Sequence, residues 1–171
     1  MSGTVISINL SPKGGVPKLP VPRATIKIEG IEGDYNWYRT NKRDMDLGRA
    51  VSLFSHERII SLQKEGHPIE IGSSGENLTV EGIPWDVLNV GTRLQAGPVL
   101  LELSEPCAPC GKISGSFIEG RFSRIDHAKK KGWSRWVARV IEPGVLEVGD
   151  WIRIQNTLSL IHISEPTRPL S

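Results

Sequence analysis

Both cysteines of this 171-residue chain lie in one short stretch, Leu101–Ile113, where an apolar segment leads directly into Cys107 and Cys110. Pro106 and Pro109 remove backbone donors and restrict φ, so we expect the thiols on a bent loop at the end of a strand. A loop in this position can present a thiol to a ligand. This loop is therefore the first candidate for a reactive site.

Three other interpretations of the cysteines are open at this point. A free cysteine is often simply a small buried hydrophobic residue. A redox pair needs a helix after its first thiol, and Pro109 with the glycines that follow disfavours one. A structural zinc site needs about four ligands, and His56, His67 and His127 do not lie at ligand spacing from one another.

Length and composition bound the fold. With 171 residues, 38% hydrophobic residues, 12 prolines and 18 glycines, the chain suits one loop-rich domain with a sizeable core. Two cysteines are too few for a disulfide framework, and the N-terminus has no apolar signal segment. No apolar run approaches the roughly 20 residues that a membrane span requires. We expect a soluble, cytoplasmic protein without a membrane partner.

The net charge of +2 and the pI near 8.6 give little support for nucleic-acid binding by the whole surface. Basic residues do gather in one segment, which contains Arg121, Arg124, Lys129, Lys130, Lys131, Arg135 and Arg139. This segment either meets an anion or forms a solvated face.

The hydrophobic pattern predicts mostly short strands. Alternating or β-branched stretches predict strands at 3–10, 24–29, 49–54, 92–95, 99–103, 136–141, 145–148 and 151–154. The last two, separated by Gly149 and Asp150, are predicted to pair as a hairpin. Residues 35–47 are expected to form a long surface loop.

Two helices are predicted between these strands. Ser55 is placed as the N-cap of the first, whose apolar stripe would consist of Ile59, Ile60 and Leu62. A second, shorter helix is expected from Ser123 to Lys130. Few helices among many short strands predict a mostly β fold, as a barrel or folded sheet.

Several motifs occur in an order that resembles the MOSC domain, named after the C-terminal domain of molybdenum cofactor sulfurase. They are Lys13–Lys18 (KGGVPK), Gly30–Asp34 (GIEGD), Arg49–Leu53 (RAVSL), Gly75–Thr79 (GENLT), Val90–Leu94 (VGTRL), Cys107–Cys110 (CAPC) and Leu146–Asp150 (LEVGD). The resemblance covers residues 1–157. Residues 158–171 resemble the translated end of a sequencing-library adapter, and we expect this non-native tail to be dispensable.

The resemblance implies a β-barrel-like fold and a molybdenum cofactor, a molybdopterin, in a protein that reduces N-oxygenated (N-hydroxylated) small molecules. The resemblance makes Cys110 the molybdenum ligand and gives Cys107 a supporting role beside it. Cofactor-binding positions carried over are Lys18, Arg49 and Asn77, with Lys13 and Glu76, and Lys112 adds a cation beside Cys110. A lysine or arginine can hold the cofactor's phosphate.

Two alternatives accompany this hypothesis. Cys110 could instead carry a persulfide as a sulfur carrier that works with a cysteine desulfurase. The basic segment, with Trp133 and Trp136 as stacking platforms, could form a nucleic-acid or anion-binding module, although nucleic acid is the less expected partner. A reductase would need a small-molecule substrate and an electron-transfer protein.

The chain departs from the family pattern at one point. Many small members have a histidine and two glycines before the arginine that matches Arg49, whereas this chain has Asp46-Leu47-Gly48. A mechanism that needs a general base there is therefore in doubt. Pyridoxal phosphate is not expected either, since the aminotransferase-like domain of the full-length sulfurase has no counterpart in this sequence.

Overall fold

The computed structural model describes residues 2–35 and 46–155. Its strands are β1 (Ser2–Leu10), β2 (Leu19–Val21), β3 (Arg23–Lys27), β4 (Gly30–Ile31), β5 (Val51–Ser55), β6 (Leu78–Glu81), β7 (Arg93–Ala96), β8 (Val99–Cys107), β9 (Arg135–Glu142), β10 (Gly144–Glu147) and β11 (Trp151–Ile154). The helices are α2 (His56–Lys64) and the 3₁₀ turns η1 (Leu47–Arg49), η2 (Trp85–Val87), η3 (Gly111–Ser116), η4 (Ile118–Gly120) and η5 (Phe122–Ile125). The expected mostly β fold is confirmed.

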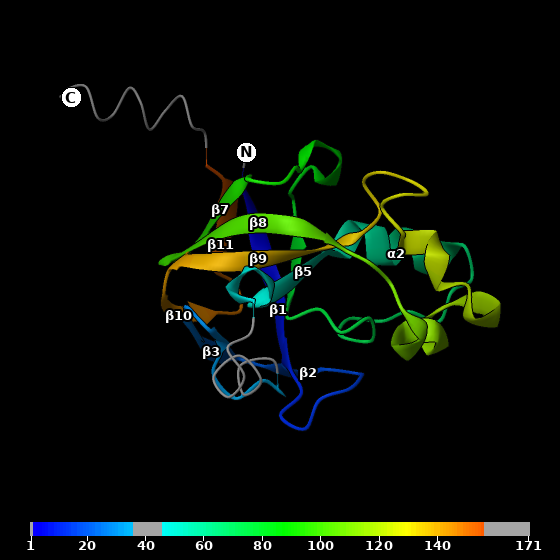
Figure 1. Cartoon of the computed structure of the whole chain (residues 1–171), viewed down its shortest axis with the longest axis horizontal. Helices are drawn as coiled ribbons and strands as arrows, with labels where there is room; N and C mark the ends of the chain where they lie inside the picture. Colours follow the sequence, from blue (N-terminus) through cyan, green and yellow to red (C-terminus); the bar gives the residue numbers. More distant parts are fainter. Residues whose placement is uncertain (1, 36–45, 156–171) are drawn as a thin grey trace.

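The main sheet closes into a barrel. Its strand order is β11-β7-β8-β9-β5-β6-β1, and β1 pairs with β11 to complete the ring, while β2 extends β1 outside it. β5 and β6 are parallel and are connected through α2, and the other pairs in the ring are antiparallel. Figure 1 shows β8 and β9 as long neighbouring strands, with α2 to one side of the barrel. Closure leaves the ring strands without a free edge.

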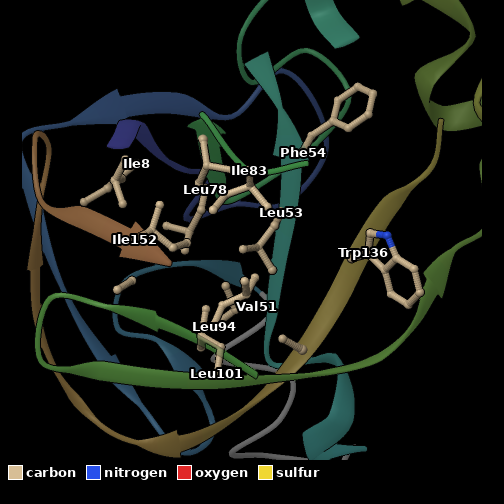
Figure 2. Close-up of a cluster of buried hydrophobic side chains, with 14 of the residues drawn as sticks. Ile8, Val51, Leu53, Phe54, Leu78, Ile83, Leu94, Leu101, Trp136 and Ile152 are labelled. Atoms are coloured by element: carbon tan, nitrogen blue, oxygen red, sulfur yellow. The ribbon is translucent and has the colours of Figure 1, made fainter. Parts of the chain in front are cut away.

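The barrel interior is filled by aliphatic side chains. Ile8, Leu53, Leu78, Leu94, Leu101 and Ile152 come from six different strands and are at most 1% exposed. They converge on one another in Figure 2, whereas Trp136 lies apart from this group. Burying each such side chain contributes about 1.5–3 kcal/mol. This core holds β8 and β9, the strands that lead to the candidate site.

The predicted final hairpin is wrong. β10 pairs with β3 in a separate three-stranded sheet with β4, whereas β11 pairs with β7 and β1. Gly149, in the turn between them, has φ +98°. The Gly149 N–H donates to the Val5 carbonyl of β1, and the Val5 N–H donates to the Asp150 carbonyl. The turn therefore moves the chain from one sheet to the other, which local sequence cannot distinguish from a hairpin.

The predicted first helix is confirmed with one change. The Ser55 hydroxyl accepts a hydrogen bond from the Arg58 N–H at 3.1 Å, and Gly66 follows the helix at φ +100°. Ile59 and Leu62 are buried, but Ile60 is 38% exposed and does not belong to the apolar stripe.

The predicted helix at 123–130 is wrong. Residues 122–125 form only a 3₁₀ turn, and Asp126 has an extended backbone. The Asp126 carboxylate accepts a hydrogen bond from the Ala128 N–H, a side-chain bond that competes with helix formation. The strand expected from Arg49 begins at Val51, because Leu47–Arg49 is a 3₁₀ turn capped by Asp46. Most of the expected loop at 35–47 lies outside the described residues.

Replacing Ser55 with alanine should lower the free energy of unfolding by about 1 kcal/mol, because the Arg58 N–H loses its acceptor. Urea unfolding followed by circular dichroism measures this loss. Ser61→Ala, on the same helix, is the matched control and should stay within about 0.5 kcal/mol of the wild type. Equal values for the two variants would contradict the capping role.

Candidate functional site

The two thiols lie where β8 leaves the barrel. Cys107 is the last residue of β8 and is buried, whereas Cys110 follows outside the strand and is exposed. Both are free thiols. The two thiols therefore differ in burial, and Cys110 is the thiol that a ligand can reach.

Both sulfurs border a pocket of about 250 Å³, which we call the thiol pocket. The residues that line it come from the 14–18 loop, the turn after β4, η1, β5, the 74–75 turn, the cysteine loop, η3 and β9. They are Gly14, Gly15, Val16, Lys18, Tyr35, Arg49, Ser52, Ser74, Gly75, Cys107, Cys110, Lys112, Ile113, Arg135 and Val137. Four basic side chains thus meet the thiols in one pocket.

Of the predicted site residues, the structure brings five to this pocket: Cys107, Cys110, Lys18, Arg49 and Lys112. They are distant in sequence and come together through the barrel topology. Lys13 is exposed and is not among the lining residues. Of the two lysines of the first loop, Lys18 is therefore the one placed to meet a ligand.

Lys18 is held by its surroundings. Its ammonium contacts both carboxylate oxygens of Asp34 at 2.8 and 2.9 Å, and its backbone N–H donates to the Gly72 carbonyl. Gly72, at φ +82°, passes so close to the Lys18 carbonyl that a Cβ at this position would clash with it. The Gly30–Asp34 motif therefore contributes an acidic partner for the lysine.

Glu76 and Asn77 do not line the thiol pocket; they are fully buried beside it. Glu76 accepts hydrogen bonds from the Gly72 N–H and from the hydroxyls of Ser74 and Thr79. The Asn77 side chain accepts from the Ser52 N–H at 3.1 Å and donates to the Asn9 carbonyl at 3.2 Å. Their polar atoms are thus occupied in holding the wall of the pocket.

Arg135 is the basic lining residue that the sequence did not single out as a site residue. It belongs to the basic segment, whose residues have different partners in the structure. Arg121 pairs with Glu119, Arg124 with Glu65 and Arg139 with Glu102, while lysines 129–131 are exposed. Arg135 alone among these points into the thiol pocket.

The two tryptophans of this segment are not free stacking platforms. Trp136 is 2% exposed, and the Trp133 ring has the guanidinium groups of Arg58 and Arg124 at 4.5 and 3.9 Å. The hydrogen bonds from Arg124 also hold the pKa of the Glu65 carboxyl below its usual range. Arg124 therefore contacts neighbours within the protein, and neither tryptophan presents a free ring face as the stacking alternative requires.

No group of three or more His, Cys, Asp or Glu side chains gathers at metal-binding distance within residues 2–35 and 46–155. None of the helices in the described part of the chain is long and apolar enough to cross a membrane.

The fold and the pocket were compared with protein-family models and with known proteins. The MOSC domain family model matches residues 39–153, so this chain belongs to the MOSC domain family. The resemblance inferred from the motifs is thereby confirmed.

Solved structures share the fold. The YuaD protein from Bacillus subtilis superposes with a TM-score of 0.70 at 19% identity, over 89% of this chain and 94% of its own. YiiM from Geobacillus stearothermophilus gives 0.67 at 23% identity, over 95% and 83%. YiiM from Escherichia coli gives 0.68 at 19% identity, over 91% and 70%.

Curated relatives are longer than the aligned region. The uncharacterized protein YflK of B. subtilis is 26% identical over 137 residues, which is 79% of this chain and 60% of YflK. A protein of Gibberella moniliformis named a reductase is 29% identical over 111 residues, which is 62% of this chain and 19% of the reductase. The chain thus spans less than two thirds of either relative.

Replacing Asn77 with alanine should lower the free energy of unfolding by about 2–3 kcal/mol, because the buried Ser52 N–H and Asn9 carbonyl lose their partner. Urea unfolding measures this change. Lys112→Ala removes an exposed side chain of the same pocket and should stay within about 0.5 kcal/mol of the wild type. A stable Asn77→Ala protein would mean that Asn77 is not structural and would return it to the ligand-binding positions.

Proposed function

We propose that this protein binds a molybdenum cofactor in the thiol pocket, with Cys110 as the protein ligand to molybdenum, and reduces N-oxygenated small molecules. The observation that carries the proposal is an exposed thiol beside four basic side chains in one pocket. Membership of the MOSC domain family supports it, and so does the similarity to a protein named a reductase.

The residues of the pocket fit such a cofactor. A thiolate is a soft ligand suited to a transition metal, and basic side chains suit the phosphate of a pterin. Cys110 would hold the metal, Lys112 would face the anionic part, and Lys18 and Arg49 would line the pocket around the rest of the cofactor. When bound, the molybdenum centre supplies the electrons that reduce an N–O bond.

The protein's own contribution is to bind and orient. Asp34 keeps the Lys18 ammonium in place, and Glu105 does the same for Arg49, whose guanidinium lies 3.3 Å from the carboxylate. Cys107, buried at the strand end, fixes the start of the loop that carries Cys110. The pocket therefore presents Cys110 from a preorganised wall.

Replacing Cys110 with serine should abolish molybdenum retention and leave the fold intact, because the exposed thiol packs against little. Cys107→Ser is the matched variant and should reduce retention only partly. The measurement is elemental analysis for molybdenum, with pterin fluorescence, on protein purified from a host that makes the cofactor. Absence of molybdenum from the wild-type protein would reject the proposal, and the reverse order of the two variants would transfer the ligand role to Cys107.

A second candidate is a sulfur carrier, which the exposure of the same thiol favours. The Cys110 thiolate would attack the outer sulfur of a donor persulfide, forming Cys110–S–SH and releasing the donor thiol. After incubation with a cysteine desulfurase and cysteine, intact-mass analysis should show one added sulfur in the wild type and none in Cys110→Ser. An unmodified wild-type mass would exclude this function.

A further inference from the structure

We propose that Arg135 is the buried anion-binding residue of the thiol pocket, and that its ligand is a tetrahedral oxyanion of the phosphate-monoester class. The carried-over family positions do not include this residue. The inference deepens the proposed function, since a pterin cofactor carries such a group, but the anion site itself is a property of this chain and can be tested without the cofactor.

Arg135 is a charged side chain that is only 6% exposed. Its Nη1 donates to the Ser74 carbonyl at 2.7 Å and its Nη2 to the Ala108 carbonyl at 3.2 Å. Its Nε is buried and has no acceptor. Both partners are neutral carbonyl groups, so the hydrogen bonds hold the guanidinium in position and leave its charge uncompensated.

Buried cations are normally paired with an acid, because an isolated charge loses its hydration on burial. Within residues 2–35 and 46–155, no carboxylate forms an ion pair with Arg135. Glu76 is joined to it only through Ser74, whose hydroxyl donates to Glu76 and whose carbonyl accepts from Arg135. A buried guanidinium that lines a pocket without a counter-ion is a site prepared for an external anion.

The other basic residues of the pocket indicate the charge of that anion. Lys18 is paired with Asp34, and Arg49 with Glu105. Lys112 is exposed and, in the described part of the chain, has no acidic partner either. Two cations are therefore left to face the ligand, which matches a phosphate monoester with its nearly two negative charges near neutral pH.

The position of Arg135 places this anion beside the thiols. In the β8–β9 pair, Arg135 is directly opposite Cys107, and the Ala108 carbonyl that it binds lies in the loop between the two cysteines. The planar guanidinium has several donors and forms strong charge-assisted bonds to phosphate oxygens. A ligand held by its phosphate at Arg135 would extend toward the exposed Cys110.

The test is binding of inorganic phosphate to the protein purified without molybdenum cofactor, measured by isothermal titration and by the rise in melting temperature over chloride at equal ionic strength. Arg135→Met should weaken phosphate binding at least tenfold. Because it also leaves the Ser74 and Ala108 carbonyls without their donor, its melting temperature without phosphate should fall, and circular dichroism checks that it is folded. Arg121→Met removes an exposed arginine that is paired with Glu119 and should bind phosphate like the wild type.

If Arg135→Met does not fold, Arg135→Gln replaces it, because glutamine keeps N–H donors and removes the charge; the same tenfold loss is expected. Phosphate binding within twofold of the wild type in a folded variant would overturn the inference, as would a wild type that responds no more to phosphate than to chloride. A wild type that binds phosphate but never retains molybdenum would reject the proposed function and leave this inference standing.

Discussion

The buried hydrogen bonds around Asn77 and Glu76 are the constraint on which the rest of the site depends. Asn77 binds Ser52 of β5 and Asn9 of β1, and Glu76 gathers three donors from the 72–79 segment. These groups are fully buried, so each would cost about 1–3 kcal/mol if left without a partner. The turn before β6 is consequently rigid where it meets the pocket.

That rigid turn determines where the cations lie. Gly72 accepts the Lys18 N–H, and Ser74 accepts the Arg135 guanidinium. Both contacts are to backbone carbonyls, whose positions follow from the bonds of Glu76 and Asn77. A segment that contributes neither a thiol nor a cation thus positions a lysine from the first loop and an arginine from β9.

The sequence predicted those features that depend on neighbouring residues. The alternating strands and the Ser55 cap follow from neighbouring residues and appear in the structure. The pairing of β10 with β3 depends on contacts over a hundred residues apart along the chain, and a Gly-Asp turn looks the same in a hairpin. Element type is a local property, whereas strand partnership is not.

Five of the residues that the sequence singled out, Cys107, Cys110, Lys18, Arg49 and Lys112, line one pocket in the structure. Their roles toward a ligand stay a prediction. The family motifs could not show whether Asn77 and Glu76 contact the ligand or support the pocket wall, because a polar residue in a motif can do either. Arg135 was hidden among arginines and lysines, and only its burial separates it from them.

The difference between the two thiols limits what can be bound. Cys107 is buried at the end of β8, whereas Cys110 lies beyond the strand and is exposed, so a ligand in the pocket meets two different thiols. In the described part of the chain, no three His, Cys, Asp or Glu side chains lie close enough together to bind one metal ion. Under the proposed function, the cofactor would bring the remaining metal ligands and Cys110 would supply one sulfur. A polar pocket with two unpaired cations suits such a ligand, because its anionic end is held by the protein while its metal end needs only one protein sulfur.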